Sequence, residues 1–319
     1  MTKLQKLTLG ALSMVLLAAL VLGGASWYLL DYSLKPGDRG RNEALAWHEM
    51  DSLYPGLVAW RDSLQAAGNW HDTIIVAPDG ARLHAYYADA PRATRRTAVL
   101  VHGYTDCAVR MMHLGRMYQR DLRANILLPD LRNAGQSAGN HYQMGWLDRL
   151  DVKEWVNRLP TFFGDSLQAV VHGVSMGAAT TMMLAGDTDV PPMVTAYVED
   201  CGYTSVTDQF TKELGEQFGL PAWPLIPLAS TLCKWRYGWS FDEASALQQV
   251  ARCTRPMLFI HGSADKFVPT AMLQPLHAAH RGPKAAWLVP EAPHARSYQL
   301  YPAEYTRRVH RFVQRYAGW

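Results

Sequence analysis

The segment Gly173-Val174-Ser175-Met176-Gly177 is the part of this chain best suited to chemistry. It follows the apolar run Ala169 to His172 and precedes the helix-like run Ala178 to Ala185, so Ser175 stands between a strand and a helix. A sharp turn at that point lifts a hydroxyl out of the sheet, and flanking glycines let strand and helix approach closely. We therefore expect Ser175 to act as a nucleophile.

The proton of that hydroxyl must pass to a general base, and histidine is the side chain best suited to this task near neutral pH. Of the 12 histidines, His294 lies in Pro293-His294-Ala295, in a loop expected after the last strand. From such a loop the ring can swing over Ser175, so we predict His294 as the base. Other histidines stand at strand ends or in a helix and are expected to serve turns and packing: His102, His172, His261, His277 and His280.

The base in turn needs a carboxylate that orients its ring and stabilises the imidazolium. In the chain order expected for this arrangement, the acid lies between the serine and the histidine. Asp265 follows the carboxyl end of an expected strand, in His261-Gly262-Ser263-Ala264-Asp265, and is the preferred acid. Asp200 also follows a strand end and remains the alternative.

The oxyanion that forms when a serine attacks a carbonyl needs hydrogen-bond donors that are already in place. The backbone N–H of Met176 comes directly after the nucleophile, at a helix N-terminus. The backbone N–H of Tyr104 follows His102 and Gly103 at the end of an earlier strand. We predict these two amides as the oxyanion hole. The chemistry requires no cofactor and no metal, and none is predicted.

These residues must be positioned by a scaffold, and the hydrophobic pattern indicates an α/β fold. A short antiparallel hairpin is expected first, around the turn Pro78-Asp79-Gly80. Short apolar runs then alternate with longer helical ones, which favours a mostly parallel sheet with helices on both faces. The expected strands are Thr73 to Ala77, Leu83 to Ala88, Thr97 to Val101, Asn125 to Pro129, Ala169 to His172, Val194 to Val198, Met257 to His261 and Ala286 to Val289.

Residues 206–250 interrupt this alternation. The segment is too long for one crossover helix and contains Trp223, Trp235, Trp239 and several prolines. It is a candidate helical cap inserted over the site, where a lid can form the substrate-binding wall. The alternative is two ordinary packed helices with a proline-rich connection.

The N-terminal segment is apolar and uncharged from Leu7 to Leu30. As a helix it would extend roughly 36 Å, which exceeds the roughly 30 Å hydrocarbon core of a bilayer. We predict residues 1–30 to be a single-pass membrane anchor. A cleaved signal peptide is the alternative because Gly23, Ala25 and Ser26 are small, although the apolar run continues through Trp27 and Tyr28. A buried core helix is a third, weaker alternative.

The charges around this segment indicate its orientation. Lys3 and Lys6 precede it, whereas basic and acidic residues balance between positions 31 and 43. The positive-inside rule therefore favours a cytoplasmic N-terminus and a domain on the extracytoplasmic side. Residues 31–70 are expected to be a linker or lead-in, and residues 71–319 the main domain.

Composition narrows the remaining possibilities. The 319 residues carry 31 basic and 28 acidic side chains that are mixed along the chain, so no nucleic-acid-binding surface is expected. The four cysteines form no C-x-x-C pair, which argues against zinc or thioredoxin-type sites. Disulfides and free buried thiols both stay open for Cys107, Cys201, Cys233 and Cys253.

Five segments together resemble the α/β-hydrolase superfamily, over roughly residues 73 to 316. They are Val101 to Tyr104, Asp130 to Ser137, Gly173 to Gly177, His261 to Asp265 and Pro293-His294. The N-terminal anchor and Glu199 to Ser205 resemble, more narrowly, membrane-associated bacterial members described as esterases or serine peptidases. The resemblance implies the same Ser-His-Asp triad and a structural role for the loop 130–137. The spacing of the last three cysteines is not required by the superfamily and suggests a bridge between cap and core.

We therefore expect a serine hydrolase that cleaves an ester or thioester, with a small-molecule acyl substrate, lipid-like substrates included. Peptidase, amidase or acyltransferase activity would use the same triad and is the alternative. A non-catalytic, membrane-tethered binding protein is a more remote one, because a fold alone does not imply an activity.

Overall fold

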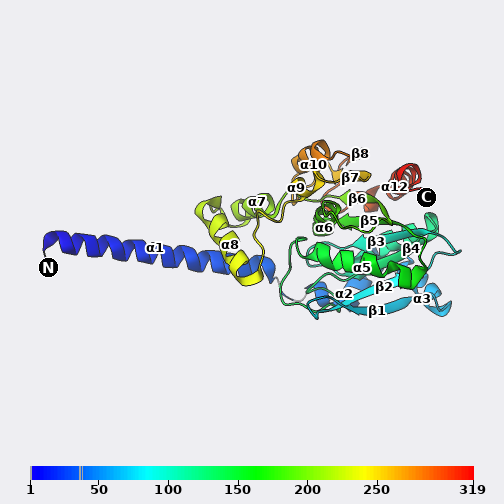
Figure 1. Ribbon diagram of the computed structural model, residues 1–319, viewed down its shortest axis with the longest axis horizontal. Helices are drawn as coiled ribbons and strands as arrows, with labels where there is room; N and C mark the ends of the chain where they lie inside the picture. Colours follow the sequence, from blue (N-terminus) through cyan, green and yellow to red (C-terminus); the bar gives the residue numbers. More distant parts are fainter. Residues whose placement is uncertain (1, 36, 38) are drawn as a thin grey trace.

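The computed structural model describes residues 2–35, 37 and 39–319 and centres on one eight-stranded sheet of order β1-β2-β4-β3-β5-β6-β7-β8. β2 pairs antiparallel with β1 and β4, and all other neighbours are parallel. The expected mostly parallel sheet is confirmed (Figure 1). The strands are β1 (His71–Val76), β2 (Arg82–Ala88), β3 (Arg96–Val101), β4 (Asn125–Pro129), β5 (Gln168–Val174), β6 (Val194–Asp200), β7 (Met257–Gly262) and β8 (Lys284–Val289).

Each expected strand is present, with boundaries within about two residues of the prediction. The turn between β1 and β2 forms at Gly80, whose N–H donates to the Ala77 carbonyl at 2.8 Å and whose φ is 86°. Both faces of the central strands are buried. On β3, Val99 and Val101 point to one core, whereas Ala98 and Leu100 point to the other.

Helices cover both faces of the sheet, as predicted. The face of Val99 packs against α5 (Asp148–Phe163), α6 (Met176–Ala185), α9 (Ala246–Val250) and α10 (Leu273–Ala279). The face of Leu100 packs against α2 (Glu43–Leu53), α3 (Leu57–Ala66), α4 (Met112–Arg116) and α12 (Pro302–Tyr316). Short elements complete the chain: η1 (Arg39–Arg41), η2 (Ala108–Met111), η3 (Met117–Asp121), η4 (Thr270–Met272) and α11 (Ser297–Leu300).

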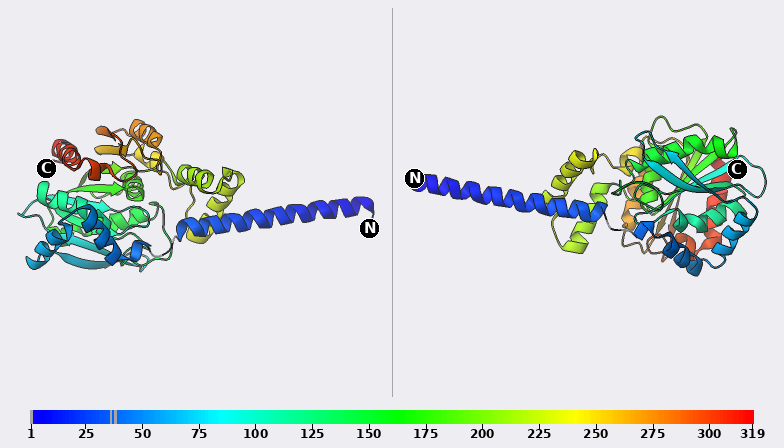
Figure 2. Two further views of the ribbon diagram at one scale, coloured as in Figure 1. Left: turned by 180° about the vertical axis from the view of Figure 1, so that it is seen from behind. Right: turned by 90° about the horizontal axis from the view of Figure 1, so that it is seen from below.

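The segment 206–250 consists of α7 (Val206–Phe218), α8 (Ala222–Tyr237) and α9, inserted between β6 and β7. We call α7 and α8 the cap helices. α7 begins where the Ser205 hydroxyl accepts a hydrogen bond from the Asp208 N–H at 3.0 Å, and it ends at Gly219 in the left-handed conformation. α8 buries Leu225, Ile226 and Ala229 among other residues. The cap helices project from the sheet beside the N-terminal helix (Figures 1 and 2).

The N-terminal helix α1 runs unbroken from Lys3 to Leu34. Its 18-residue apolar window has a mean hydropathy of 2.2 and is not buried, so α1 is long and apolar enough to cross a membrane. The final turns differ, because Ser26, Leu30 and Leu34 are buried. The helix thus continues past the expected boundary at Leu30 and packs its end into the core, while the rest extends away from the domain (Figure 2).

Residues 43–66, expected within the lead-in, form α2 and α3. Their buried side chains Ala46, Met50 and Trp60 belong to the core on the Leu100 face of the sheet. This segment is therefore part of the packed domain.

All four cysteines are free thiols and buried, so the suggested bridge between cap and core is not formed. Burial raises the pKa of Cys107 and Cys233 to about 12 and that of Cys253 to about 11. Such thiols are largely unreactive at neutral pH. They act here as small apolar packing groups.

Candidate active site

Ser175 occupies a sharp turn between β5 and α6, with φ 59° and ψ −121°. A positive φ is uncommon for a residue other than glycine and stores strain that the surroundings must hold. The Ser175 N–H donates to the Asp200 carbonyl at 2.8 Å, which ties the turn to the end of β6. The expected strand, turn and helix around the serine are therefore present.

The flanking glycines allow the close approach that this turn needs. A Cβ atom on Gly173 would overlap the Gly177 carbonyl, and one on Gly177 would overlap the Val101 carbonyl. In both cases the obstacle is backbone, which cannot rotate away. The glycines of the motif therefore serve packing between β5, α6 and β3.

We expect Gly173→Ala to destabilise the fold by about 3 kcal/mol or more, because the new methyl group has no space. The matched control is Gly215→Ala in the interior of α7, where nothing lies within 4 Å of the added Cβ. That change should stabilise the protein by roughly 0.5–1 kcal/mol. Denaturant unfolding of both variants measures the change in the free energy of unfolding. Equal changes in the two variants would contradict the packing argument.

The structure brings Ser175, His294 and Asp265 into one chain of hydrogen bonds. Ser175 Oγ lies 2.8 Å from His294 Nε2, and His294 Nδ1 lies 2.7 Å from Asp265 Oδ2. A carboxylate can only accept, so the Nδ1–H donates to Asp265 and Nε2 is left to accept from the serine. This is the geometry required for a histidine that activates a hydroxyl.

Asp265 is held rigidly for this contact. Its side chain is fully buried, and its Oδ1 accepts the N–H groups of Phe267 at 3.0 Å and Val268 at 2.9 Å. These donors compensate the buried charge and leave Oδ2 directed at His294. His261 lies beside the same oxygen, at 3.5 Å, but its Nε2–H donates to the Val268 carbonyl at 3.0 Å, and burial lowers its pKa.

Asp200, the alternative acid, has other partners. Its carboxylate accepts the hydroxyls of Ser297 at 3.1 Å and Tyr305 at 3.0 Å. Burial raises its pKa to about 6, although both hydroxyls act in the opposite direction. Asp200 thus anchors α11 and α12 beneath the site, and His294 receives its carboxylate contact from Asp265.

The other histidines occupy packing positions. His102 Nδ1–H donates to the Gly103 carbonyl at 2.8 Å, and its Nε2 accepts the Leu131 N–H at 2.9 Å. His172 bridges the hydroxyls of Tyr118 and Tyr305 at 3.0 and 2.9 Å. Both rings are fully buried, and each ring nitrogen already has a hydrogen-bond partner, so neither histidine is available to act as the base in place of His294.

The two predicted oxyanion donors lie beside the nucleophile. Met176 is the first residue of α6, so its N–H has no acceptor within the helix. A Cβ on Gly103 would lie 3.3 Å from the Ser175 Cβ, which places the segment before Tyr104 against the serine. The Tyr104 hydroxyl donates to the Ser33 carbonyl at 2.6 Å and fixes this loop to the end of α1.

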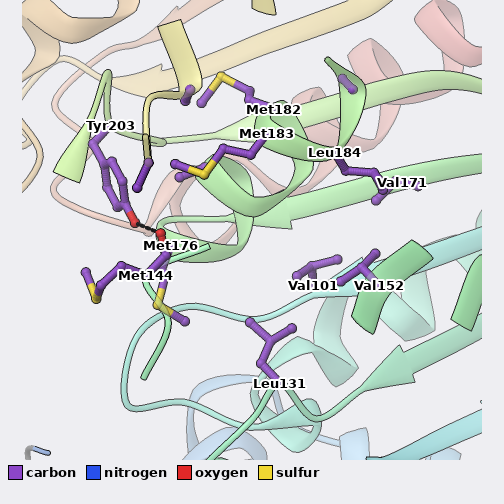
Figure 3. Close-up of a cluster of buried hydrophobic side chains, with 14 of the residues drawn as sticks. Val101, Leu131, Met144, Val152, Val171, Met176, Met182, Met183, Leu184 and Tyr203 are labelled. Atoms are coloured by element: carbon purple, nitrogen blue, oxygen red, sulfur yellow. Dashed lines mark hydrogen bonds between the residues drawn. The ribbon is translucent and has the colours of Figure 1, made fainter. Parts of the chain in front are cut away.

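An apolar cavity of about 470 Å³ opens on one side of Ser175. The floor of this cavity is continuous with the hydrophobic core, where Met144 and Tyr203 lie beside Met176 (Figure 3). The Tyr203 hydroxyl donates a hydrogen bond to the Met144 carbonyl at 2.8 Å. The other walls of the cavity come from the cap helices and α1. The main apolar residues of these walls are Leu29, Leu30, Phe210, Leu214, Leu225, Ile226 and Ala229, and Phe241 after α8 adds to them.

A second cavity of about 850 Å³ opens on the other side of Ser175 and is more polar. It is lined by His294 together with residues of α2, such as His48 and Glu49, and by Arg110 and Arg296. Ser175 lies on the boundary of both cavities. A substrate with an apolar and a polar part could therefore place its reacting bond at the serine.

Sequence reasoning missed α1 and α2 as contributors to these walls. Leu29 and Leu30 fell within the expected anchor, and His48 and Glu49 within the expected lead-in. No local signal distinguishes a membrane-spanning leucine from one that lines a cavity. Phe267 was also missed, although its ring lies 4.9 Å from that of His294 and lines both cavities.

Among the residues that the structure describes, two groups of side chains bring metal-ligating atoms close together: Cys201, Asp265 and His294, and Glu43, His84 and Asp130. In the first, Cys201 joins Asp265 and His294, but burial raises the pKa of the thiol well above its ordinary value and disfavours the thiolate that binds metals. In the second, both ring nitrogens of His84 contact carboxylates, Asp130 at 2.6 Å and Asp72 at 3.1 Å. Neither arrangement presents a free histidine nitrogen.

Comparison with known proteins finds relatives of this chain. The profile of the alpha/beta hydrolase family matches residues 98–309. The Bacillus subtilis (strain 168) protein named "Uncharacterized protein YqkD" is 29% identical over 254 residues, 79% of this chain and 82% of the relative.

Solved structures show the same fold. The Pyrococcus furiosus esterase Pf2001 superposes with a TM-score of 0.64 at 22% identity, covering 80% of this chain and 96% of the esterase. A puromycin-hydrolyzing peptidase of Mycobacterium tuberculosis superposes with a TM-score of 0.60 at 18% identity, over 78% of this chain and 39% of the peptidase.

Proposed function

The chain belongs to the alpha/beta hydrolase family, and from this premise we propose that it is a serine hydrolase that cleaves carboxylic esters or thioesters. The observation that carries the proposal is the contact of Ser175 with His294 at 2.8 Å and of His294 with Asp265 at 2.7 Å. Three groups far apart in the sequence meet in the order that acyl transfer requires.

In the proposed reaction, Ser175 Oγ attacks the substrate carbonyl carbon while its proton passes to His294 Nε2. Asp265 stabilises the imidazolium through Nδ1–H, and the N–H groups of Met176 and Tyr104 donate to the oxyanion. The C–O or C–S bond then breaks, and His294 returns the proton to the leaving group. Water attacks the acyl-enzyme by the same route and releases the acid.

The two cavities suggest how a substrate is oriented. The apolar cavity fits an acyl group, and the polar cavity fits the alcohol or thiol that leaves. This assignment favours small-molecule substrates with a lipid-like acyl part.

Amide or peptide cleavage and acyl transfer are the second candidate, since they use the same nucleophile, base and oxyanion donors. The observation that keeps this candidate open is that the contacts of Ser175, His294 and Asp265 are the same for every acyl leaving group. A purely binding role is disfavoured because an inert scaffold has no need of a serine held at a strained φ against a histidine.

We further propose that α1 anchors the protein as a single-pass, uncleaved helix, with Lys3 and Lys6 on the cytoplasmic side and the hydrolase domain on the extracytoplasmic side. The support for retention is that Ser26, Leu30 and Leu34 pack into the domain on the same unbroken helix. The domain proper then comprises the end of α1 as well as residues 39–319, and the cap helices belong to it.

A fluorophosphonate probe tests the proposed nucleophile directly. The full-length protein in detergent should form one covalent adduct, mapped to Ser175 by peptide mass spectrometry, because only an activated serine reacts quickly. The control is His294→Ala, which retains Ser175 but removes its base and should label at least about a hundredfold more slowly. An adduct on another residue, or equal labelling of the control, would refute the assignment.

A further inference from the structure

The cap helices expose large apolar side chains to an unusual degree. Trp223 is 78% exposed and Trp235 is 75% exposed, and neither lines the cavities beside Ser175. Other exposed apolar side chains lie on α1, on α7, on α8 and in the turn between the two cap helices, and the Trp27 ring lies 6.4 Å from that of Trp235. They are Trp27, Tyr28, Tyr32, Phe218, Leu228 and Leu220. We call this set, with the two tryptophans, the cap tip. An exposed apolar cluster of this size marks a surface that meets a partner or a membrane.

The cap tip is attached to the last turns of α1. The Ser26 hydroxyl donates to the Leu225 carbonyl at 3.5 Å, and Asp31 forms an ion pair with Arg236 at 2.9 Å. Arg236 also lies over the Trp27 ring at 3.9 Å. These contacts hold the cap helices at a fixed position along the axis of α1, next to residues 26–31.

The length of the free part of α1 sets where a bilayer would end. From Leu7, the first residue after Lys6, to Ala25, the last before the buried Ser26, α1 carries no charge and extends roughly 28 Å at about 1.5 Å per residue. This nearly matches the roughly 30 Å hydrocarbon core, so with Lys6 at one membrane surface the other boundary falls near Ser26. The cap helices meet α1 at this level, because the Ser26 hydroxyl donates to the Leu225 carbonyl, and they lie beside the end of α1 nearer the domain (Figures 1 and 2). Tryptophan and tyrosine are the side chains that favour such an interface.

The apolar cavity opens about one helical turn beyond that boundary, on the domain side. Leu29, Tyr32 and Ser33 of α1 line it on one side, and Gln217 and Phe218 of α7 on the other. Tyr32 and Phe218 are partly exposed, and their rings meet edge to face at 5.4 Å. The cavity thus extends from Ser175 to the seam between α1 and α7, next to the cap tip.

Resting on the proposed hydrolase function, we propose that the cap tip inserts into the membrane interface and that the acyl chain of a membrane-resident ester enters the apolar cavity from the bilayer, between α1 and α7. Three independent features converge on this surface: the exposed tryptophans, the length of the free helix and the opening of the cavity. The end of α1 is then a specificity-determining wall as well as an anchor. A soluble ester reaches Ser175 through the polar cavity without using the cap tip.

The kinetic test uses full-length protein in phosphatidylcholine and phosphatidylglycerol vesicles. The variant Trp223→Ser with Trp235→Ser is compared with Val76→Ser, which removes an apolar side chain that is 62% exposed from edge strand β1, outside the cap tip. Hydrolysis of a vesicle-bound palmitoyl ester should fall about tenfold or more in the double variant, because interfacial contact scales with buried apolar area. Hydrolysis of a soluble butanoyl ester and both rates of the control should stay within about twofold of wild type.

A second measurement tests insertion without catalysis. Trp223→Cys labelled with a polarity-sensitive fluorophore should shift its emission to the blue on vesicle reconstitution, whereas Val76→Cys with the same label should not. If the labelled Trp223→Cys protein shows no shift, or if the double variant hydrolyses vesicle-bound ester like wild type, the inference is wrong. If wild type hydrolyses neither ester but the shift occurs, the proposed hydrolase function fails while the membrane contact of the cap tip stands.

Discussion

Replacing Ser175 by alanine is expected to lower kcat/KM for a soluble short-chain ester by about 10⁵- to 10⁶-fold, the scale on which loss of a triad nucleophile acts. The side chain contributes one oxygen, which contacts His294 at 2.8 Å. No other described group is positioned to replace this oxygen. KM should change little, because the cavities on both sides of the serine remain.

The companion variant His294→Ala should lose nearly as much activity, and the double variant little more than either single change, because the two residues act as a unit. Thermal unfolding must show that the variants are folded. Residual hydrolysis within about a hundredfold of wild type in folded Ser175→Ala would contradict the assignment, since background catalysis by an oxyanion hole is far weaker.

The second large effect is expected for Asp265→Asn, which should reduce kcat by about 10⁴-fold while the fold is retained. An amide presents N–H groups as well as a carbonyl, so it no longer dictates that His294 Nδ1 carries the proton. The backbone N–H groups of Phe267 and Val268 can still donate to the remaining carbonyl oxygen. The loss should therefore appear in kcat and much less in stability.

Asp200→Asn is the matched control, because Asp200 is equally buried and stands at the end of the neighbouring strand. Its partners are Ser297 and Tyr305, so kcat should fall by about tenfold at most. If Asp200→Asn lost more activity than Asp265→Asn, the acid would be assigned to the wrong strand.

Asp200→Asn should also change how the free energy of unfolding depends on pH. The pKa of Asp200 rises from 3.8 to about 6 in the folded protein, chiefly because the carboxyl is buried. Between these values the folded state holds a proton that the unfolded chain has lost, so this group destabilises the fold progressively as pH rises through the window. Asp200→Asn should remove that component, and denaturant unfolding at pH 4 and pH 7 measures the difference.

Much of the site could be predicted from the sequence because its parts are local. A glycine-flanked serine between an apolar strand and a helix specifies its own turn. Strands of one parallel sheet bring their carboxyl ends to one edge, so residues that follow them are expected to meet. His294 and Asp265 were predicted on that ground, and the structure brings both to Ser175.

The choice between Asp265 and Asp200 required the tertiary structure. Both follow strand ends, and only the directions of their side chains and the hydroxyls of Ser297 and Tyr305 separate them. The state of the cysteines likewise depends on distances between segments far apart in the chain, and all four are free.

The role of α1 shows the same division. An apolar helix long enough to span a bilayer can be predicted from residues 7–30 without any tertiary information, because length and hydropathy are properties of the segment alone. If the anchor ended at Leu30, as predicted, a soluble fragment could begin at Asp31. Such a fragment would lack Leu29 and Leu30, which form part of the cavity wall. The packing of the last turns of this helix against α8, and their place in the wall of the apolar cavity, could not be predicted in this way. Burial depends on which distant surface a segment meets, and that surface is known only from the folded structure.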